Sequence, residues 1–370
     1  MTGRDTLRGR VLELIAGGPR GPSGPGAFDC LALDVFAYQF EQNEPYRRFC
    51  ERRGMSPAVV SHWTEIPAVP TAAFREAVLI CGDPADAAAV FCTSGTSGGP
   101  ERRGRHYVRD LSLYETSALT NFSRHVLPDR ARLPMLILGP PPELAPDSSL
   151  TWMFEKVRVA YGAQASGYFI GTDGLRFDAL LAALEESERG AMPVTILGTA
   201  SALAHLIEAL AGRRLRFALP SGSRLMETGG FKRRGGEVPR EEFYARLIDR
   251  LGLSELYCVA EYGMTELCSQ FYDNVLNERA RGRSPQLRYK VVPPWVRTRV
   301  LDAETLEPVP TGEIGVLRHF DLANLDSVTA IQTDDLGVAG ADGFEILGRA
   351  AGAELRGCSL AMDEWLTAQR

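Results

Sequence analysis

The stretch that decides the fold runs Leu256-Tyr257-Cys258-Val259-Ala260-Glu261-Tyr262-Gly263-Met264-Thr265-Glu266. Its first half is a short apolar run, typical of a strand, and its second half becomes polar where that strand ends. Ligands of α/β proteins bind at the carboxyl ends of the strands. At such an edge Tyr262 is suited to stack on a base, Thr265 to donate to a phosphate and Glu266 to hold magnesium. A capped turn between a strand and a helix is the alternative interpretation.

The segments before this stretch, from about residue 90 onward, alternate between short apolar runs and longer runs with helical periodicity. Such alternation predicts a parallel α/β sheet. The expected strands are Leu136–Leu138, Gly167–Ile170, Val194–Leu197, Phe217–Leu219 and Leu256–Ala260, and the expected helices include Phe177–Glu186 and Ala200–Leu210.

The two ends of the chain have other patterns. Residues 28 to about 91 show helix-like spacing interrupted by prolines, which predicts a helical layer. After about Leu287, short strands joined by turns predict an antiparallel β unit, with strands at Tyr289–Val292, Val296–Leu301, Glu313–His319, Ser327–Gln332 and Gly343–Leu347. We therefore expect a helical lead-in at 1–89, an α/β nucleotide-binding core at 90–286, an antiparallel β subdomain at 287–347 and a C-terminal tail at 348–370.

The composition excludes several classes of function. The 370 residues include 41 Lys+Arg and 47 Asp+Glu, a formal charge of −6 without any basic block, which argues against nucleic-acid and anionic-membrane partners. The apolar runs are shorter than the ~18–20 residues of a membrane helix, and the N-terminus lacks a secretory signal, so we expect a cytoplasmic protein. The seven scattered cysteines contain no C-x-x-C pair, which argues against a disulfide framework or a zinc site.

A loop rich in glycine and hydroxyl groups, Thr93-Ser94-Gly95-Thr96-Ser97-Gly98-Gly99-Pro100, follows the apolar run at residues 87–92. Glycines allow backbone N–H groups to approach a phosphate closely, and the hydroxyls add further donors. It lacks the Gly-Lys-Ser/Thr of a Walker A loop and the G-x-S-x-G of a hydrolase. Taken alone, an ordinary loop is the more frequent meaning of such a stretch.

Three further motifs contain side chains suited to ligand binding or catalysis. Met226-Glu227-Thr228-Gly229-Gly230-Phe231-Lys232 contains one of only three lysines, the others being Lys156 and Lys290, although Lys232 also suits a solvated basic turn beside Arg233 and Arg234. In Gln332-Thr333-Asp334-Asp335-Leu336-Gly337 a carboxylate can accept hydrogen bonds from two ribose hydroxyls. Alternatively, the Asp334–Asp335 pair belongs to an ordinary turn. In Leu347-Gly348-Arg349 an arginine can clamp a ribose or phosphate.

The order of these motifs resembles the adenylate-forming acyl- and aryl-CoA ligase superfamily from about residue 60 onward. Together with the terminal Arg356-Gly357-Cys358-Ser359-Leu360, it resembles the LuxE-type acyl-protein synthetases. The resemblance implies the N-terminal domain of an adenylate-forming enzyme, with parallel α/β layers and a small antiparallel β subdomain but without the mobile C-terminal domain. It also implies ATP, Mg²⁺, a carboxylic acid substrate of the fatty acid class, and a reductase or carrier protein as acyl acceptor.

The resemblance also implies a role for each matching residue. Phosphates would be held by Thr93, Ser94, Gly95, Thr96, Ser97 and Gly98, and the nucleotide pocket would include Gly229, Gly230, Tyr262, Gly263 and Thr265. Asp335 and Arg349 would hold the ribose. Glu266 would bind Mg²⁺, Lys232 would stabilise the charge that develops on the α-phosphate, and Cys358 would accept the acyl group.

The chain departs from the superfamily pattern in ways that put CoA-ligase activity in doubt. Glu101 stands where most members have a lysine, so Arg102 or Arg103 would have to substitute, and Ala351 replaces the usual hinge aspartate. Nearby Arg349 and Arg356 are expected to lower the pKa of Cys358. The alternatives are a buried structural cysteine at 358, a ligase that delivers its adenylate to a carrier protein or CoA, and a non-catalytic adenylate-binding subunit.

Overall fold

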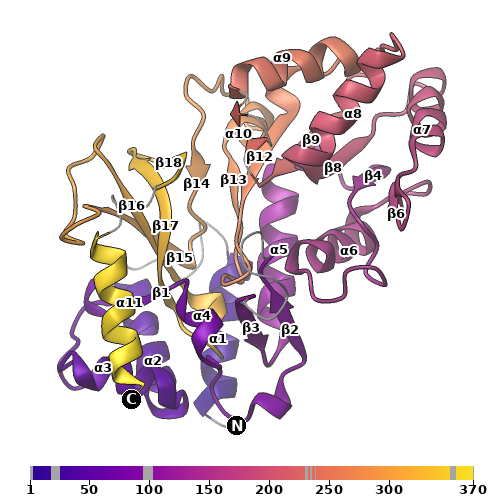
Figure 1. Cartoon of the computed structure of the whole chain (residues 1–370). Helices are drawn as coiled ribbons and strands as arrows, with labels where there is room; N and C mark the ends of the chain where they lie inside the picture. The colour runs from indigo at the N-terminus through magenta and orange to yellow at the C-terminus, as the bar shows by residue number, and fades with distance from the viewer. Residues whose placement is uncertain are drawn as a thin grey trace. The chain divides into compact units, whose positions relative to one another are not determined.

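The computed structural model describes residues 3–17, 26–94, 103–229, 232–233, 236–237, 239–350 and 356–369, with the backbone alone at 232, 233, 236, 237 and 356–361. Its contacts divide the chain into two compact units. The first unit contains Met1–Thr120, Met264–Gln270 and Val291–Arg370, and the second contains Asn121–Gly263 and Phe271–Lys290. The chain passes from one unit to the other within helix α5 (Leu111–His125) and strand β14 (Lys290–Val291), both labelled in Figure 1, and also between Gly263 and Met264 and between Gln270 and Phe271.

The second unit is built on a mainly parallel sheet with the strand order β13-β12-β9-β8-β4-β5. Strands β4, β8, β9 and β12 pair in parallel, and β13 runs antiparallel to β12. The strands are β4 (Met135–Leu138), β5 (Gly167–Tyr168), β8 (Thr195–Thr199), β9 (Arg224–Thr228), β12 (Cys258–Tyr262) and β13 (Phe271–Asp273). Short paired strands are β6 (Ile170–Gly171) with β7 (Gly174–Leu175), and β10 (Lys232–Arg233) with β11 (Gly236–Glu237).

Helices join these strands, as the alternating pattern predicts. They are α6 (Ser149–Tyr161), α7 (Phe177–Arg189), α8 (Ala200–Gly212), α9 (Arg240–Leu251) and α10 (Val275–Ala280). Central strands such as β4 are buried at every residue, because helices cover both faces of a parallel sheet. Apolar side chains from these strands and from α7, α8 and α9 form one core, which includes Leu184, Ile196, Leu206, Leu225 and Leu247.

The first unit combines an antiparallel sheet with helices. Its strands follow the order β15-β16-β17-β18, and β1 pairs in parallel with β17. The helices are α1 (Gly3–Gly17), α2 (Ala27–Gln42), α3 (Glu44–Arg52), α4 (Ala73–Glu76) and α11 (Arg356–Ala368). The strands are β1 (Val69–Pro70), β2 (Ala89–Cys92), β3 (Arg105–Val108), β15 (Val296–Leu301), β16 (Ile314–Asp321), β17 (Ala330–Ala339) and β18 (Gly343–Arg349).

Most predicted elements are confirmed to within a few residues, and β15 lies where it was expected, at 296–301. Two predictions are wrong. Residues 217–219 form no strand: the N–H groups of Phe217 and Leu219 donate to the carbonyls of Arg250 and Leu251 at the end of α9, so the segment pairs with a helix end. The helical pattern expected up to Phe91 ends near Arg53, and prolines interrupt the short elements that follow.

Among the described residues, no helix combines the length and the apolar character that a membrane crossing requires.

Candidate functional site

The glycine- and hydroxyl-rich loop connects β2 to β3, two antiparallel strands of the first unit. Its base is closed by Thr93, whose N–H donates to the Gly104 carbonyl at 2.9 Å and whose Oγ1 accepts from the Gly104 N–H at 2.9 Å. Arg103 donates to the carbonyls of Thr93 and Cys92. The structure therefore gives Arg103, one of the two expected substitutes for the loop lysine, a role in closing the loop. Residues 95–102, including Gly95, Thr96, Ser97, Gly98 and Arg102, lie outside the described residues.

The backbone of Thr265 and Glu266 is fixed by two buried side chains of the first unit. His106 on β3 donates from Nδ1 to the Thr265 carbonyl at 2.7 Å, and Asn324 donates to the Glu266 carbonyl at 2.8 Å. Burial lowers the pKa of His106 to about 4, so the ring is neutral near pH 7 and keeps its proton on the donating nitrogen. These contacts hold the acidic end of the central motif in one position.

Glu266 is a buried carboxylate with little charge compensation. Its exposed fraction is 7%, and burial raises its pKa to about 7, an effect that Arg349 and Arg75 partly oppose and Asp335 reinforces. The charges of Asp335 and of the two arginines therefore all act on the Glu266 carboxylate. The Arg75 side chain also lies against Gly104, where an added Cβ would be 3.6 Å from its Cγ. The loop base and the expected magnesium and ribose residues therefore belong to one neighbourhood.

Asp335 and Arg349 face each other across the strand pair β17–β18. Arg349 donates from Nε to Asp335 Oδ1 at 3.1 Å, and the backbone N–H of Asp335 donates to Thr333 Oγ1 at 3.1 Å. The Asp335 pair is therefore part of a strand, and the ordinary turn considered from the sequence is absent from this described segment. A largely buried carboxylate held by a guanidinium at a strand pair can accept hydrogen bonds from vicinal hydroxyls.

Within the second unit, the carboxyl ends of two adjacent parallel strands lie side by side. Thr228 on β9 lies opposite Glu261 on β12, and Thr228 Oγ1 donates to Glu261 Oε2. Gly229 has a φ of +91°, a conformation that side chains other than glycine rarely adopt, so the strand turns sharply after Thr228. Tyr262 ends β12 with its ring 5.7 Å from that of Phe271. Gly263 follows it, exposed, and Gly230 lies outside the described residues.

Beneath these strand ends lies a buried cluster of ions in the second unit. Asp273 accepts from Arg240 at 2.7 Å and Arg288 at 2.8 Å, and Lys290 Nζ lies 3.0 Å from its other oxygen. Burial alone would raise the pKa of Asp273, but Lys290, Arg240 and Arg288 together lower it. Lys290 also donates to the Ala260 carbonyl at 2.7 Å, which ties the cluster to β12.

Sequence reasoning missed several residues that support the site. His106, Asn324 and Arg75 support the Glu266 neighbourhood, while Asp273 and Lys290 support the end of β12. Lysine is rare in this sequence, and that rarity could have drawn attention to Lys290. It was interpreted as a signal for Lys232 instead. Lys232 lies on β10, and Cys358 lies on α11, but their side chains are outside the description.

Three further observations concern metal ligands, helix α6 and the cysteines. No group of three His, Cys, Asp or Glu residues suited to a metal occurs in the described part of the chain. Met153 and Phe154 on α6 are buried in the core of the second unit. Four cysteines are buried, at 50, 81, 258 and 268, as expected of small apolar side chains, whereas Cys30 is exposed.

Comparisons with known proteins agree with the motif order. The sequence profile of a family described as "Acyl-protein synthetase, LuxE" matches residues 26–367. The long-chain-fatty-acid–luciferin-component ligase of Vibrio harveyi is 25% identical over 350 residues, covering 92% of this chain and 88% of the relative. The ligase of the same name from Aliivibrio fischeri is 24% identical over 315 residues, covering 84% of this chain and 78% of the relative.

Solved structures show the fold. A structure of 2-hydroxyisobutyryl-CoA ligase in complex with 2-HIB-AMP and CoA is 16% identical, with a TM-score of 0.60, over 87% of this chain and 69% of that one. ATP-bound MatB from Rhodopseudomonas palustris is 17% identical, with a TM-score of 0.50, over 73% of this chain. The chain spans about half of MatB, 49% of its length. The chain therefore has the fold of adenylate-forming enzymes, as its motifs predicted.

Proposed function

The chain belongs to the LuxE family of acyl-protein synthetases, and from that premise we propose that it activates a carboxylic acid of the fatty acid class with ATP and transfers the acyl group to its own Cys358. The observation that carries the proposal is the convergence of Glu266, Asp335 and Arg349 beside the base of the β2–β3 loop. The names of the two ligases from Vibrio harveyi and Aliivibrio fischeri support a fatty acid as the substrate.

In the first half-reaction, a carboxylate oxygen of the acid attacks the α-phosphorus of ATP. The bond to the bridging oxygen breaks, and acyl-adenylate and pyrophosphate result. The loop from Thr93 through Gly98 donates to phosphate oxygens, and Asp335, oriented by Arg349, accepts from the ribose hydroxyls. Tyr262 and the glycines at 229, 230 and 263 form the base pocket, Thr265 donates to a phosphate, and Lys232 stabilises the charge that develops on the α-phosphate.

Magnesium fits the residues that are present. Mg²⁺ is usually held by one or two carboxylates together with substrate phosphates, so a single buried carboxylate at the phosphate loop suffices. Glu266 is such a group, because burial raises its pKa to about 7 in spite of the opposing effect of Arg349 and Arg75. Bound Mg²⁺ would supply the missing positive charge and neutralise phosphate charge.

In the second half-reaction, the Cys358 thiolate attacks the acyl carbonyl, AMP leaves and the thiol proton passes to solvent. The backbone of Cys358 lies near the start of α11, after residues 351–355, which are outside the described part. The thioester would then pass its acyl group to a reductase or carrier protein. We further propose that the chain acts in the cytoplasm, where thiols stay reduced, since the described cysteines are free.

Intact mass spectrometry tests both half-reactions at once. The protein is incubated with ATP, Mg²⁺ and single acids from C6 to C16, and pyrophosphate release is recorded in parallel. We expect an ATP-dependent mass increase equal to the acid minus water, absent in Cys358→Ser and retained in Cys30→Ser. Cys30 is the matched control because its side chain is exposed.

Other outcomes point to the alternatives. Pyrophosphate release without an adduct in the wild type would favour delivery of the adenylate to a carrier protein or CoA, and adding CoA or pantetheine would then yield a free thioester. ATP binding with neither product would indicate a non-catalytic subunit. An adduct that persists in Cys358→Ser would refute the assignment of the acyl acceptor.

A further inference from the structure

The glycine- and hydroxyl-rich loop offers a triphosphate few positive charges. Its hydroxyl and N–H groups are neutral donors, and the two arginines at its end, Arg102 and Arg103, follow Glu101. Arg103 donates to the carbonyls of Cys92 and Thr93, so its guanidinium is already used to close the loop. Pyrophosphate gains negative charge as it leaves the α-phosphate, and a preorganised cation stabilises such charge best. A cation from outside the loop would meet this need.

Helix α4 packs directly against the base of the loop. A Cβ added to Gly104 would lie 3.6 Å from Cγ of Arg75 and 3.6 Å from Cβ of Phe74. Gly104 is the residue that closes the loop with Thr93 through two hydrogen bonds of 2.9 Å. The aliphatic stem of Arg75 therefore lies at the closed end of the loop, next to the first of the residues assigned to phosphate.

The same helix is tied to the segment that contains Glu266. Phe74 is exposed by only 1%, and its ring lies 5.7 Å from the ring of His106 in an edge-to-face arrangement. His106 in turn donates to the carbonyl of Thr265 at 2.7 Å. Burial raises the pKa of Glu266, and the positive charge of Arg75 opposes that effect. Helix α4 is thus fixed between the loop base and the proposed magnesium ligand.

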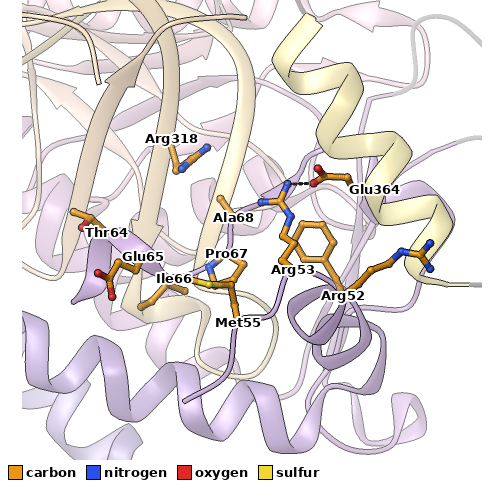
Figure 2. A pocket seen from close by; sticks show the side chains of 11 residues that line it. Arg52, Arg53, Met55, Thr64, Glu65, Ile66, Pro67, Ala68, Arg318 and Glu364 are labelled. Carbon is orange, nitrogen blue, oxygen red and sulfur yellow. Dashed lines mark hydrogen bonds and ion pairs between the residues drawn. The ribbon is translucent and has the colours of Figure 1, made fainter. Parts of the chain in front are cut away.

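The chain that enters α4 is equally well fixed. The N–H of Thr71 donates to the Gln332 carbonyl at 3.1 Å, which continues the pairing of β1 with β17, the strand that contains Asp335. Before β1, Ile66 and Ala68 are buried, and Figure 2 shows both in the segment that leads to this strand. The position of the Arg75 backbone is therefore set by the sheet that also positions the proposed ribose residue.

Arg75 differs from other arginines of the first unit in having no ion-pair partner among the residues that the structure describes, and it is exposed. By contrast, Arg53 is paired with Glu364, as Figure 2 shows, and Arg52 donates to the Thr367 carbonyl. An arginine with a packed stem and an unpaired head is available to an oxyanion. Guanidinium groups bind phosphate oxygens in a bidentate manner.

We propose that Arg75 binds the β- and γ-phosphate oxygens of ATP and holds the pyrophosphate as it leaves. This inference rests on the proposed function, because it adds a residue to the same phosphate site. When a carboxylate oxygen of the acid bonds to the α-phosphorus, the bond to the bridging oxygen breaks and its electron pair passes to pyrophosphate. The Arg75 guanidinium donates hydrogen bonds to the oxygens that gain this charge, and no proton is transferred.

Isothermal titration calorimetry of the full chain with Mg²⁺ and without acid tests this assignment. The probes are pyrophosphate, ATP and AMP, and the variants are Arg75→Gln, Arg75→Lys and Arg48→Gln. Arg48 is the matched control, because it is an exposed arginine of α3 that pairs with Glu44. We expect Arg75→Gln to weaken the binding of pyrophosphate and ATP at least about tenfold and to leave AMP unchanged. Arg75→Lys should lose less, since it keeps the charge, and the control should bind all three probes normally.

Normal pyrophosphate binding by an Arg75→Gln protein that melts like the wild type would overturn the proposal. An equal loss of AMP binding would do the same, because AMP lacks the β- and γ-phosphates. Arg75→Gln added to Glu266→Gln should weaken pyrophosphate binding further. If the double variant binds pyrophosphate like Glu266→Gln alone, Arg75 acts only through Glu266 and the assignment is wrong.

The test also separates this proposal from the proposed acyl transfer. The titrations require neither the acid nor Cys358, so a wild type that binds ATP and pyrophosphate without forming an acyl adduct would refute the transfer and leave the Arg75 assignment to be decided by its own variants. A wild type that binds neither ATP nor pyrophosphate would overturn both proposals.

Discussion

Each unit of the molecule buries a carboxylate, and the two are compensated in opposite ways. Asp273 in the second unit has three cations within 3.0 Å and is 1% exposed. Glu266 in the first unit is 7% exposed, and among the residues that the structure describes no cation lies within salt-bridge distance of it. Their pKa values move apart accordingly, downward for Asp273 and up to about 7 for Glu266.

The difference separates a structural carboxylate from one that is ready for a ligand. Burying a charge is unfavourable unless partners compensate it. Cations of the protein itself compensate the charge of Asp273, and their ion pairs connect β13, α9 and β14. Glu266 has no such cation among the described residues, and this lack of compensation is what we propose suits it to bind magnesium. Perturbed carboxylates of this second kind concentrate at functional sites.

The largest effect is expected from removing the compensated charge. Asp273→Asn leaves Arg240, Arg288 and Lys290 without their shared anion, so we expect the free energy of unfolding to fall by about 3–5 kcal/mol. Urea denaturation followed by circular dichroism measures this. Lys156→Met is the control, because Lys156 lies on α6 beside the Trp152 ring and outside the cluster. A loss below about 1 kcal/mol would contradict the structural role.

Removing the uncompensated charge should affect chemistry and not folding. Glu266→Gln keeps the shape and removes the Mg²⁺ ligand, so we expect pyrophosphate release to fall by about 100-fold to 1,000-fold, the range for losing one group that stabilises developing charge. Stability at pH 8 should be equal or higher, because an unfavourable buried charge is gone. A variant that releases pyrophosphate normally would remove Glu266 from the metal site.

The pH dependence of stability gives a third test. The pKa of Glu266 is about 7 in the folded chain against 4.5 for a free glutamate, so the folded state holds this proton more firmly. As pH rises from about 4.5 to 7, the unfolded chain ionises first and the folded state loses up to about 3 kcal/mol of relative stability. Melting temperatures of wild type and Glu266→Gln from pH 5 to 8 should therefore converge at low pH and separate at high pH.

Parallel melting curves for the two proteins would contradict this expectation. Glu261, whose pKa burial also raises to about 7, titrates in both proteins and cancels in the comparison. Added Mg²⁺ and ATP should reduce the separation, since a bound cation stabilises the ionised form of Glu266.

The sequence singled out Glu266 and Asp335, for which ligand roles are proposed, but it did not single out the residues that support them. Strands such as Val296–Leu301 were visible as apolar runs, and Asp335 and Glu266 stand in motifs whose chemistry is local. Asp273 and Lys290 are 17 residues apart by number and meet only because β13 and β14 bring them to β12. His106 likewise reaches Thr265 from a distant strand. Contacts of this kind depend on tertiary pairing, which no local pattern encodes.

The same limit explains the errors. Phe217–Leu219 has the composition of a strand, but its backbone N–H groups find partners at the end of α9, a choice that depends on where that helix ends in space. The sequence also could not predict how well the charge of Glu266 is compensated, because compensation depends on the distances from Glu266 to Arg75 and Arg349. The pairing of Arg349 with Asp335 agrees with the expectation that the two act together, and their ribose role stays a prediction.

The smallest expected effect comes from Arg349, the cation shared by the neighbourhood of Glu266. Its side chain is 68% exposed, so Arg349→Lys should change the free energy of unfolding by less than about 1 kcal/mol. Lysine keeps the charge but not the planar fork that orients Asp335, so the KM for ATP should rise by about tenfold while kcat changes little. Pyrophosphate release at varied ATP measures both constants. If kcat falls and KM stays constant, Arg349 acts on the reacting phosphate and not on the ribose, and the compensation of Glu266 by arginine is greater than the salt-bridge geometry indicates.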